Sequence, residues 1–119
     1  MDSSGLENRL IDFASSIIEL IKLLPNNKAG NHMAGQITRS GISPALNYGE
    51  AQCAESRKDF IHKMSICLKE LKETLICLKI IDRSKLCKSS SLLDKCKEEN
   101  NELISIFVSS INTAKKGKL

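Results

Sequence analysis

Three stretches of the chain carry mostly apolar residues at alternating spacings of three and four: Leu6 to Leu24, Phe60 to Ile81 and Leu93 to Ala114. This spacing places side chains on one face of an α-helix, and its repetition over successive heptads is typical of helices that pack side by side. Only two Pro and six Gly occur among the 119 residues, which leaves little material for β-turns. The pattern therefore predicts an all-α fold.

A fourth helix is expected between the first and second of these stretches, although its apolar pattern is less regular. It contains Pro44, which removes the hydrogen bond to the Ser40 carbonyl and predicts a kink. Ser4 followed by Glu7 predicts the cap of the first helix, and Ser56 predicts the cap of the third. The predicted helices cover residues 5–24, 31–51, 56–82 and 91–114.

Four long helices joined by short loops favour an antiparallel up-down-up-down four-helix bundle. The length fits one domain over residues 1–119, and residues 115–119 are expected to form a disordered tail. No segment approaches the roughly 18 uninterrupted apolar residues of a membrane span, and no basic leader precedes an apolar run. We therefore expect neither a membrane span nor a signal peptide.

A polar stripe runs along the second predicted helix. Its five residues follow spacings of 3, 4, 4 and 3 and fall within an arc of about 80° on one helix face. Their amide, guanidinium, hydroxyl and carboxylate groups can pair with one another in a partly buried network. We interpret the stripe as fixing helix register or subunit geometry, while a ligand site would fit the same residues. The stripe comprises Gln36, Arg39, Ser43, Asn47 and Glu50.

The net charge of +4 is unevenly distributed. Residues 1–54 contain four basic and five acidic side chains, whereas residues 55–119 contain 14 basic and nine acidic ones. A basic half attracts polyanions such as RNA, but a surface that only confers solubility has the same composition. The candidate nucleic-acid contacts are Arg57, Lys58, Lys63, Lys115, Lys116 and Lys118.

The five Cys are odd in number and form no CxxC pair, which is typical of reduced thiols in a cytoplasmic protein. Cys53 and Cys87 are the two whose burial is least clear from the sequence. His32 and His62 have no second ligand at zinc spacing, so we expect no metal. The other thiols lie at apolar helix positions: Cys67, Cys77 and Cys96.

No constellation of catalytic residues is visible. Glu50, Glu70 and Glu73 are the carboxylates that an acid–base mechanism would use, but a di-metal site in a helix bundle needs Glu-x-x-His, and neither His follows a Glu at that spacing. Glu70 and Glu73 are interpreted as helix-surface charges. No Ser-His-Asp set, phosphate loop or cofactor fingerprint occurs. We expect a non-enzymatic protein with no cofactor and no small-molecule substrate.

The middle third of the chain carries a specific motif. Residues 39–51 read RSGISPALNYGEA, which resembles the pattern R-S-x-x-S-x-x-x-N-[IY]-x-E-[GA] of the four-helix-bundle proteins encoded in 23S rRNA intervening sequences. Residues 54–64 and the LKELKETL run at 68–75 are also similar to that family. The chain departs from it at Pro44, where Val or Ile is common, and at Ile76 and Cys77, where an aromatic pair is common.

The resemblance implies a left-handed bundle that assembles as a ring-like homopentamer, and it extends to the accessory factor of diversity-generating retroelements, whose basic surface binds nucleic acid. The family carries a ribosomal-protein label that does not define a mechanism. Two functions remain open at this point. One is an oligomeric scaffold that binds rRNA or another RNA, and the other is a protein–protein interaction module that binds no nucleic acid.

Overall fold

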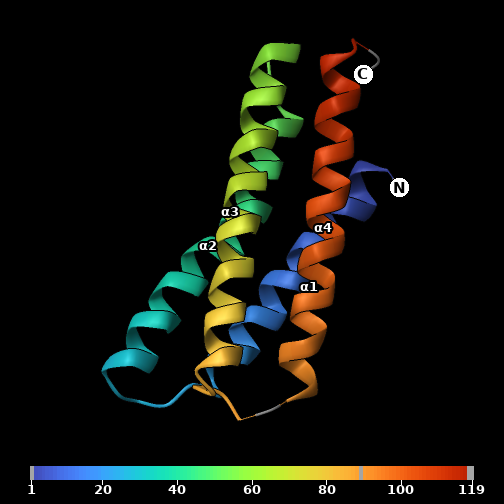
Figure 1. Ribbon diagram of the computed structural model, residues 1–119. Helices are drawn as coiled ribbons and strands as arrows, with labels where there is room; N and C mark the ends of the chain where they lie inside the picture. The colour runs from blue at the N-terminus through green and yellow to red at the C-terminus, as the bar shows by residue number, and fades with distance from the viewer. Residues whose placement is uncertain (1, 89, 118–119) are drawn as a thin grey trace.

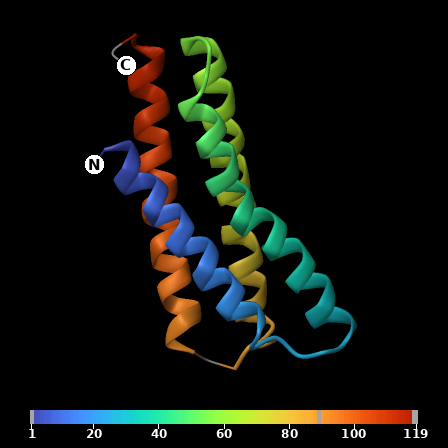
Figure 2. The ribbon, with the colours of Figure 1, turned by 180° about the vertical axis from the view of Figure 1, so that it is seen from behind.

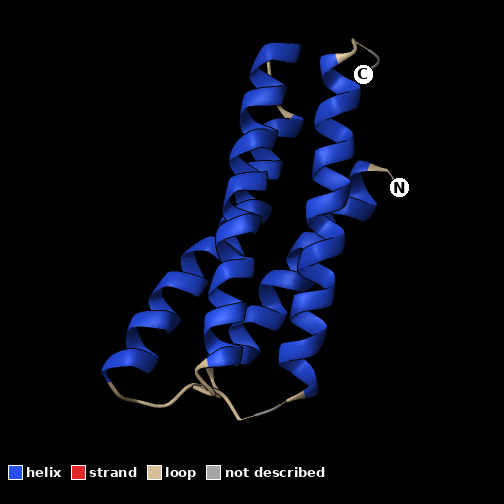
Figure 3. Cartoon of the chain, in the orientation of Figure 1, coloured by secondary structure: helices blue, strands red, loops and turns tan. Residues whose placement is uncertain are grey.

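The computed structural model describes residues 2–88 and 90–117, and these residues form four helices and no strand (Figures 1 and 3). The predicted all-α architecture is therefore confirmed. The helices are α1 (Ser3–Ile21), α2 (Lys28–Gln52), α3 (Arg57–Arg83) and α4 (Ser91–Lys115).

Consecutive helices run antiparallel and pack as neighbours around a single core (Figures 1 and 2). α3 packs against α2 and α4, and α1 completes the ring by packing against the same two helices. The result is an elongated bundle of 46 × 22 × 21 Å. Within the described residues, no helix carries an apolar run that would span a bilayer.

The core is mostly aliphatic, as the near absence of aromatic residues requires. Its largest fully buried side chains are Phe13 and Phe107, and the Phe107 ring meets Tyr48 edge-on at a centroid distance of 5.9 Å. Polar contacts between helices also lie inside the core. The Thr74 hydroxyl is 2.9 Å from the Ser40 hydroxyl, and the fully buried Asn100 donates to the Leu71 carbonyl at 3.1 Å. These contacts tie α3 to α2 and to α4.

The thiols are mostly internal. Cys67 and Cys96 are buried, and loss of solvation raises the pKa of Cys67 to about 12 and that of Cys96 to about 11. Both therefore remain protonated and unreactive at neutral pH. Of the two thiols whose burial the sequence left open, Cys87 is buried and Cys53 is exposed.

The first helix differs at both ends from its prediction. Asp2, not Ser4, caps it, because the Asp2 carboxylate accepts the Gly5 amide at 2.7 Å. The helix ends at Ile21 instead of residue 24, because the next two residues form tight turns before Pro25. The Ser56 cap of α3 is confirmed, since its hydroxyl accepts the Asp59 amide at 3.0 Å.

The C-terminal end is more ordered than expected. Lys115 belongs to α4, and the amides of Lys116 and Gly117 bond back to helix carbonyls, so disorder does not begin at residue 115. The remaining tail positions, 118 and 119, lie outside the described residues. Gly117 has a φ of 72°, a left-handed conformation that suits glycine.

α2 bends along its length. Its C-terminal half follows α3, whereas its N-terminal half leans away from α3 (Figures 1 and 2). The buried Pro44 lies inside the helix and supplies the cause, as predicted. At Gly41 the helix comes so close to α1 that a Cβ would lie 2.9 Å from the Ile17 side chain.

The α1–α2 turn closes tightly over the start of α2, which begins three residues before its predicted start. A Cβ on Gly30 would lie 1.9 Å from the Pro25 carbonyl oxygen, a backbone atom that cannot move aside. Gly35 stands on the same helix with nothing within 4 Å of its Cβ position. The two glycines therefore form a matched pair for mutation.

We expect Gly30→Ala to destabilise the protein by about 1–3 kcal/mol, because the methyl group forces the turn open. Gly35→Ala should raise stability by about 0.5–1 kcal/mol, because alanine favours the helix and restricts the unfolded chain. Urea unfolding followed by circular dichroism measures both changes. A neutral Gly30→Ala would contradict the tight packing of the turn.

Candidate nucleic-acid interface

The polar stripe on α2 follows the edge of the helix next to α3. Gln36, Arg39 and Glu50 are exposed, whereas Ser43 and Asn47 are half-buried. Asn47 donates to the Ser43 hydroxyl at 2.7 Å and to the Ser43 carbonyl at 3.1 Å. This is the only pairing inside the stripe among the interactions of the described residues.

Arg39 pairs across the helix interface instead. Its guanidinium donates to Glu70 at 2.8 Å and to Glu73 at 3.1 Å, both on α3. The bond to Glu73 and the charge of Glu70 raise the pKa of Arg39. The expected pairing within the stripe is therefore found for Asn47 and Ser43 but is wrong for Arg39, because α3 offers Arg39 two carboxylates.

The interpretation of Glu70 as a surface charge is also wrong. Its side chain is only 8% exposed and lies beneath the guanidinium of Arg39, which is itself 55% exposed. Glu73, at 39%, is the more exposed of the two. Arg39 thus neutralises a buried carboxylate from the outside and holds α2 to α3.

Every carboxylate of α3 has an ion partner, three of them on another helix and one on α3 itself. Asp59 pairs with Lys63 on the next turn at 3.4 Å, and Asp82 pairs with Lys97 of α4 at 2.9 Å. With Glu70 and Glu73 joined to Arg39, no acidic side chain of α3 remains free. Three of the four pair with a neighbouring helix, although Glu73 and Asp82 keep 39% and 46% of their side chains exposed.

The outer surface of α3 is lined by five exposed cations that share an arc of about 80°. None has a carboxylate within 4 Å among the described residues, and the set extends about 38 Å along the helix. We call this set the α3 basic ridge. It consists of Lys58, Lys69, Lys72, Lys79 and Arg83.

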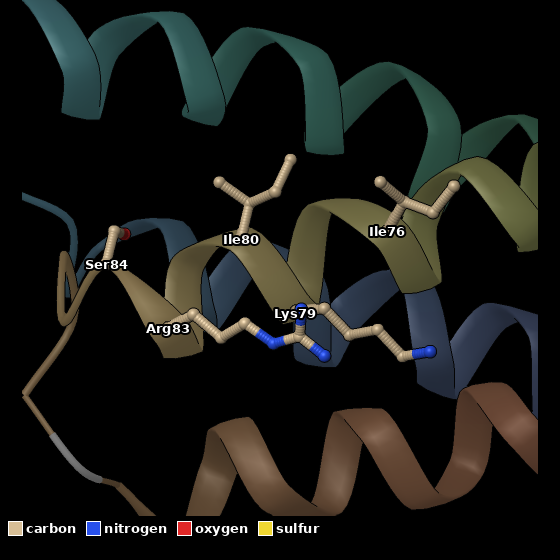
Figure 4. Close-up of a pocket in the computed structure, with 5 residues that line it drawn as sticks. All are labelled: Ile76, Lys79, Ile80, Arg83 and Ser84. Carbon is tan, nitrogen blue, oxygen red and sulfur yellow. The ribbon is translucent and has the colours of Figure 1, made fainter.

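Figure 4 shows how the C-terminal part of the ridge is built. Lys79 and Arg83 extend on the α4 side of α3, whereas Ile76 and Ile80 project on the side of α2 (Figure 4). The two isoleucines are 59% and 47% exposed. The surface therefore combines a charged edge with an apolar edge.

The predicted nucleic-acid contacts divide into three groups. Arg57 and Lys58 begin α3 at the end of the bundle where α4 finishes at Lys115, and Gly117 beyond α4 lies against the Arg57 guanidinium (Figure 1). Lys63 is engaged by Asp59, which weakens its candidacy. Lys118 lies outside the described residues.

The predicted contacts omit most of the ridge. Only Lys58 is common to both sets, although the spacing of the other four along one predicted helix is visible in the sequence. The signal that finds them is a helical face with repeated Lys or Arg and no acidic residue. The omitted residues are Lys69, Lys72, Lys79 and Arg83.

The described residues contain no group of three His, Cys, Asp or Glu side chains arranged to hold a metal ion. The site therefore offers positive charge and hydrogen-bond donors, with a few apolar side chains beside them. Such a surface can attract and bind a polyanion.

We expect Arg39→Ala to lower the midpoint of urea unfolding more than Lys72→Ala does. Lys72 serves as the control because it is an exposed cation of α3 that has no ion partner among the described residues. The reason is that Glu70 would keep its charge in a buried position without a partner. Adding Glu70→Gln should recover part of the loss by removing that charge. Equal midpoints for Arg39→Ala and Lys72→Ala would show that the pair does not join α2 to α3.

Comparison with known proteins agrees with this architecture. The chain is similar to a crystal structure of a protein with unknown function from the S23 ribosomal protein family of Bacteroides thetaiotaomicron. The two share 33% sequence identity with a TM-score of 0.85, over 95% of this chain and 100% of the other. No curated protein matches. The sequence model of the 23S rRNA-intervening sequence proteins matches residues 7–109, and the chain therefore belongs to that family.

Proposed function

We propose that this protein is a non-enzymatic, homo-oligomeric scaffold that binds RNA through the α3 basic ridge. The observation that carries the proposal is the division of charge on α3, where all four carboxylates are paired and six cations, five of them in the ridge, have no ion partner among the described residues. The name of the family, which refers to 23S rRNA, makes structured rRNA the first RNA to test.

The geometry of the ridge suits backbone recognition. Exposed Lys and Arg side chains along one rigid helix can contact successive phosphates, and such contacts release counterions without reading sequence. No aromatic side chain lies within the ridge, so base stacking is not part of its contribution. Binding should therefore be strongly salt-dependent and weakly sequence-specific.

Assembly of several copies of this chain would strengthen a weak contact between each ridge and RNA. Each chain carries a net charge of +4, and the resemblance implies five copies in a ring. Exposed apolar side chains on the outer surface supply material for contact between copies, above all Leu46, which is 67% exposed on α2. Several ridges on one particle would bind a long RNA far more tightly than one ridge.

The second candidate is a protein–protein interaction module that binds no nucleic acid. The observation that favours it is the same apolar material, since Leu46 and Ile76 are each more than half exposed. Gln36 and Glu50, the stripe residues without a described side-chain partner, could then fix the geometry of the contact. This function requires the ridge to be dispensable, so one set of charge variants separates the two candidates.

We expect Lys72→Gln with Lys79→Gln to weaken binding of a large-subunit rRNA fragment and to lower the slope of log K against log salt. The slope should fall by about 0.7–0.9 for each phosphate that the variant no longer neutralises. Fluorescence anisotropy at several salt concentrations measures both effects.

The matched control is Lys28→Gln with Lys95→Gln, which removes the same charge from exposed positions outside the ridge. Light scattering confirms that each variant keeps the mass of the parent. Equal loss in both double variants would mean that net charge, not the ridge, governs binding. An RNA affinity that is unaffected in both would show that RNA binds outside the ridge, and absence of RNA binding by the parent would favour the protein–protein module.

A further inference from the structure

The bundle is hollowed at the end where α2 finishes, α3 begins and α4 finishes. α1 has 19 residues against 25 to 27 in the other helices, and its N-terminus stops short of that end (Figures 1 and 2). Two hollows of about 460 and 480 Å³ lie here, and both are lined by Tyr48 and Ser110. Volumes of this size accommodate small organic ligands.

Tyr48 stands between the two hollows. It is only 4% exposed, yet its hydroxyl has no hydrogen-bond partner among the described residues. The hydroxyl oxygen is not among the fully buried polar atoms, so it belongs to the small part of the side chain that solvent reaches. Burial, followed by the charge of Glu7, raises the pKa of Tyr48, so the hydroxyl remains a proton donor at neutral pH. The side chain therefore presents an unused donor to whatever fills the hollow.

The hollow of about 460 Å³ also contains the start of α3. Arg57 is the first residue of the helix, and the backbone amides of Arg57 and Lys58 have no acceptor among the described residues. A helix N-terminus beside a guanidinium attracts phosphate. Gly117 lies over this guanidinium, since a Cβ there would be 2.7 Å from Nη1. The turn after α4 thereby restricts Arg57 to the rim.

The other residues that line this hollow suit a planar ligand that bears polar groups. Phe60 supplies aromatic surface, Tyr48 supplies its hydroxyl, and Gln52, Ser56 and Ser110 supply an amide and two further hydroxyls. Nucleotides combine these needs, because their bases stack on aromatic rings and their riboses and base edges form hydrogen bonds. The lining residue Arg57 is followed in the chain by Lys58, where the basic ridge begins.

We propose that this hollow binds one nucleoside phosphate, with the phosphate at Arg57 and the first amides of α3 and the nucleoside against Phe60, hydrogen-bonded to the Tyr48 hydroxyl. The proposal rests on the proposed RNA function, because the nucleotide is taken to be the 5′ end of an RNA that follows the ridge. A free nucleotide has the same chemistry, and the experiment distinguishes the two sources.

AMP binding is measured by calorimetry for the parent, Tyr48→Phe and Arg57→Gln, with Lys95→Gln as the control. Tyr48→Phe removes only a hydroxyl that has no described partner, so stability should be unchanged while AMP binding weakens about 3–10-fold. Arg57→Gln should weaken it about 10–100-fold. Lys72→Gln with Lys79→Gln should leave AMP binding intact, even though it weakens RNA binding.

The source of the phosphate is tested with one RNA carrying either a 5′-phosphate or a 5′-hydroxyl. Tighter binding of the phosphorylated form, abolished in Arg57→Gln, supports the RNA end as ligand. AMP binding with the same mutational sensitivity but no effect of the 5′-phosphate supports a free nucleotide in this hollow. Absence of AMP binding, equal binding of inorganic phosphate, or an unaltered affinity in Tyr48→Phe overturns the site, while the ridge variants still test RNA binding independently.

Discussion

The ion pairs of α3 determine both how the bundle is held and what it presents to solvent. Arg39 reaches from α2 to Glu70 and Glu73, and Lys97 reaches from α4 to Asp82. These contacts join α3 to the two helices beside it. They also pair Glu70, Glu73 and Asp82 with cations of other helices, so that the cations of the ridge have no ion partner among the described residues. Cohesion of the bundle and a basic outer surface thus have one electrostatic origin.

Much of the fold follows from local sequence. Three-four spacing of apolar residues determines a helix face without reference to distant residues, so the four helices were predictable, and so was the bend at Pro44. The pairing of Asp59 with Lys63 is an i,i+4 contact that the sequence also contains. The α3 basic ridge is also predictable from local sequence, since recognising it requires only the helical spacing of Lys and Arg and the absence of acidic residues between them on that face.

Other features depend on how distant segments meet. Arg39 and Glu70 are 31 positions apart, and only the packing of α2 on α3 selects this pair over Glu50, which shares a helix with Arg39. The burial of Glu70 follows from the same packing. The need for glycine at position 30 arises from the backbone of Pro25, and the exposure of the Tyr48 hollow arises from the shorter α1. None of these relations can be seen along one helix.

The central claim is that RNA lies along the outer face of α3, and a lysine footprint tests it most directly. The protein is acetylated briefly with and without the rRNA fragment, and each lysine is quantified by mass spectrometry. The account predicts that RNA protects Lys58, Lys69, Lys72 and Lys79, whereas Lys22, Lys28 and Lys95 react equally in both samples. Uniform protection of all lysines, or protection that spares the ridge, would contradict it.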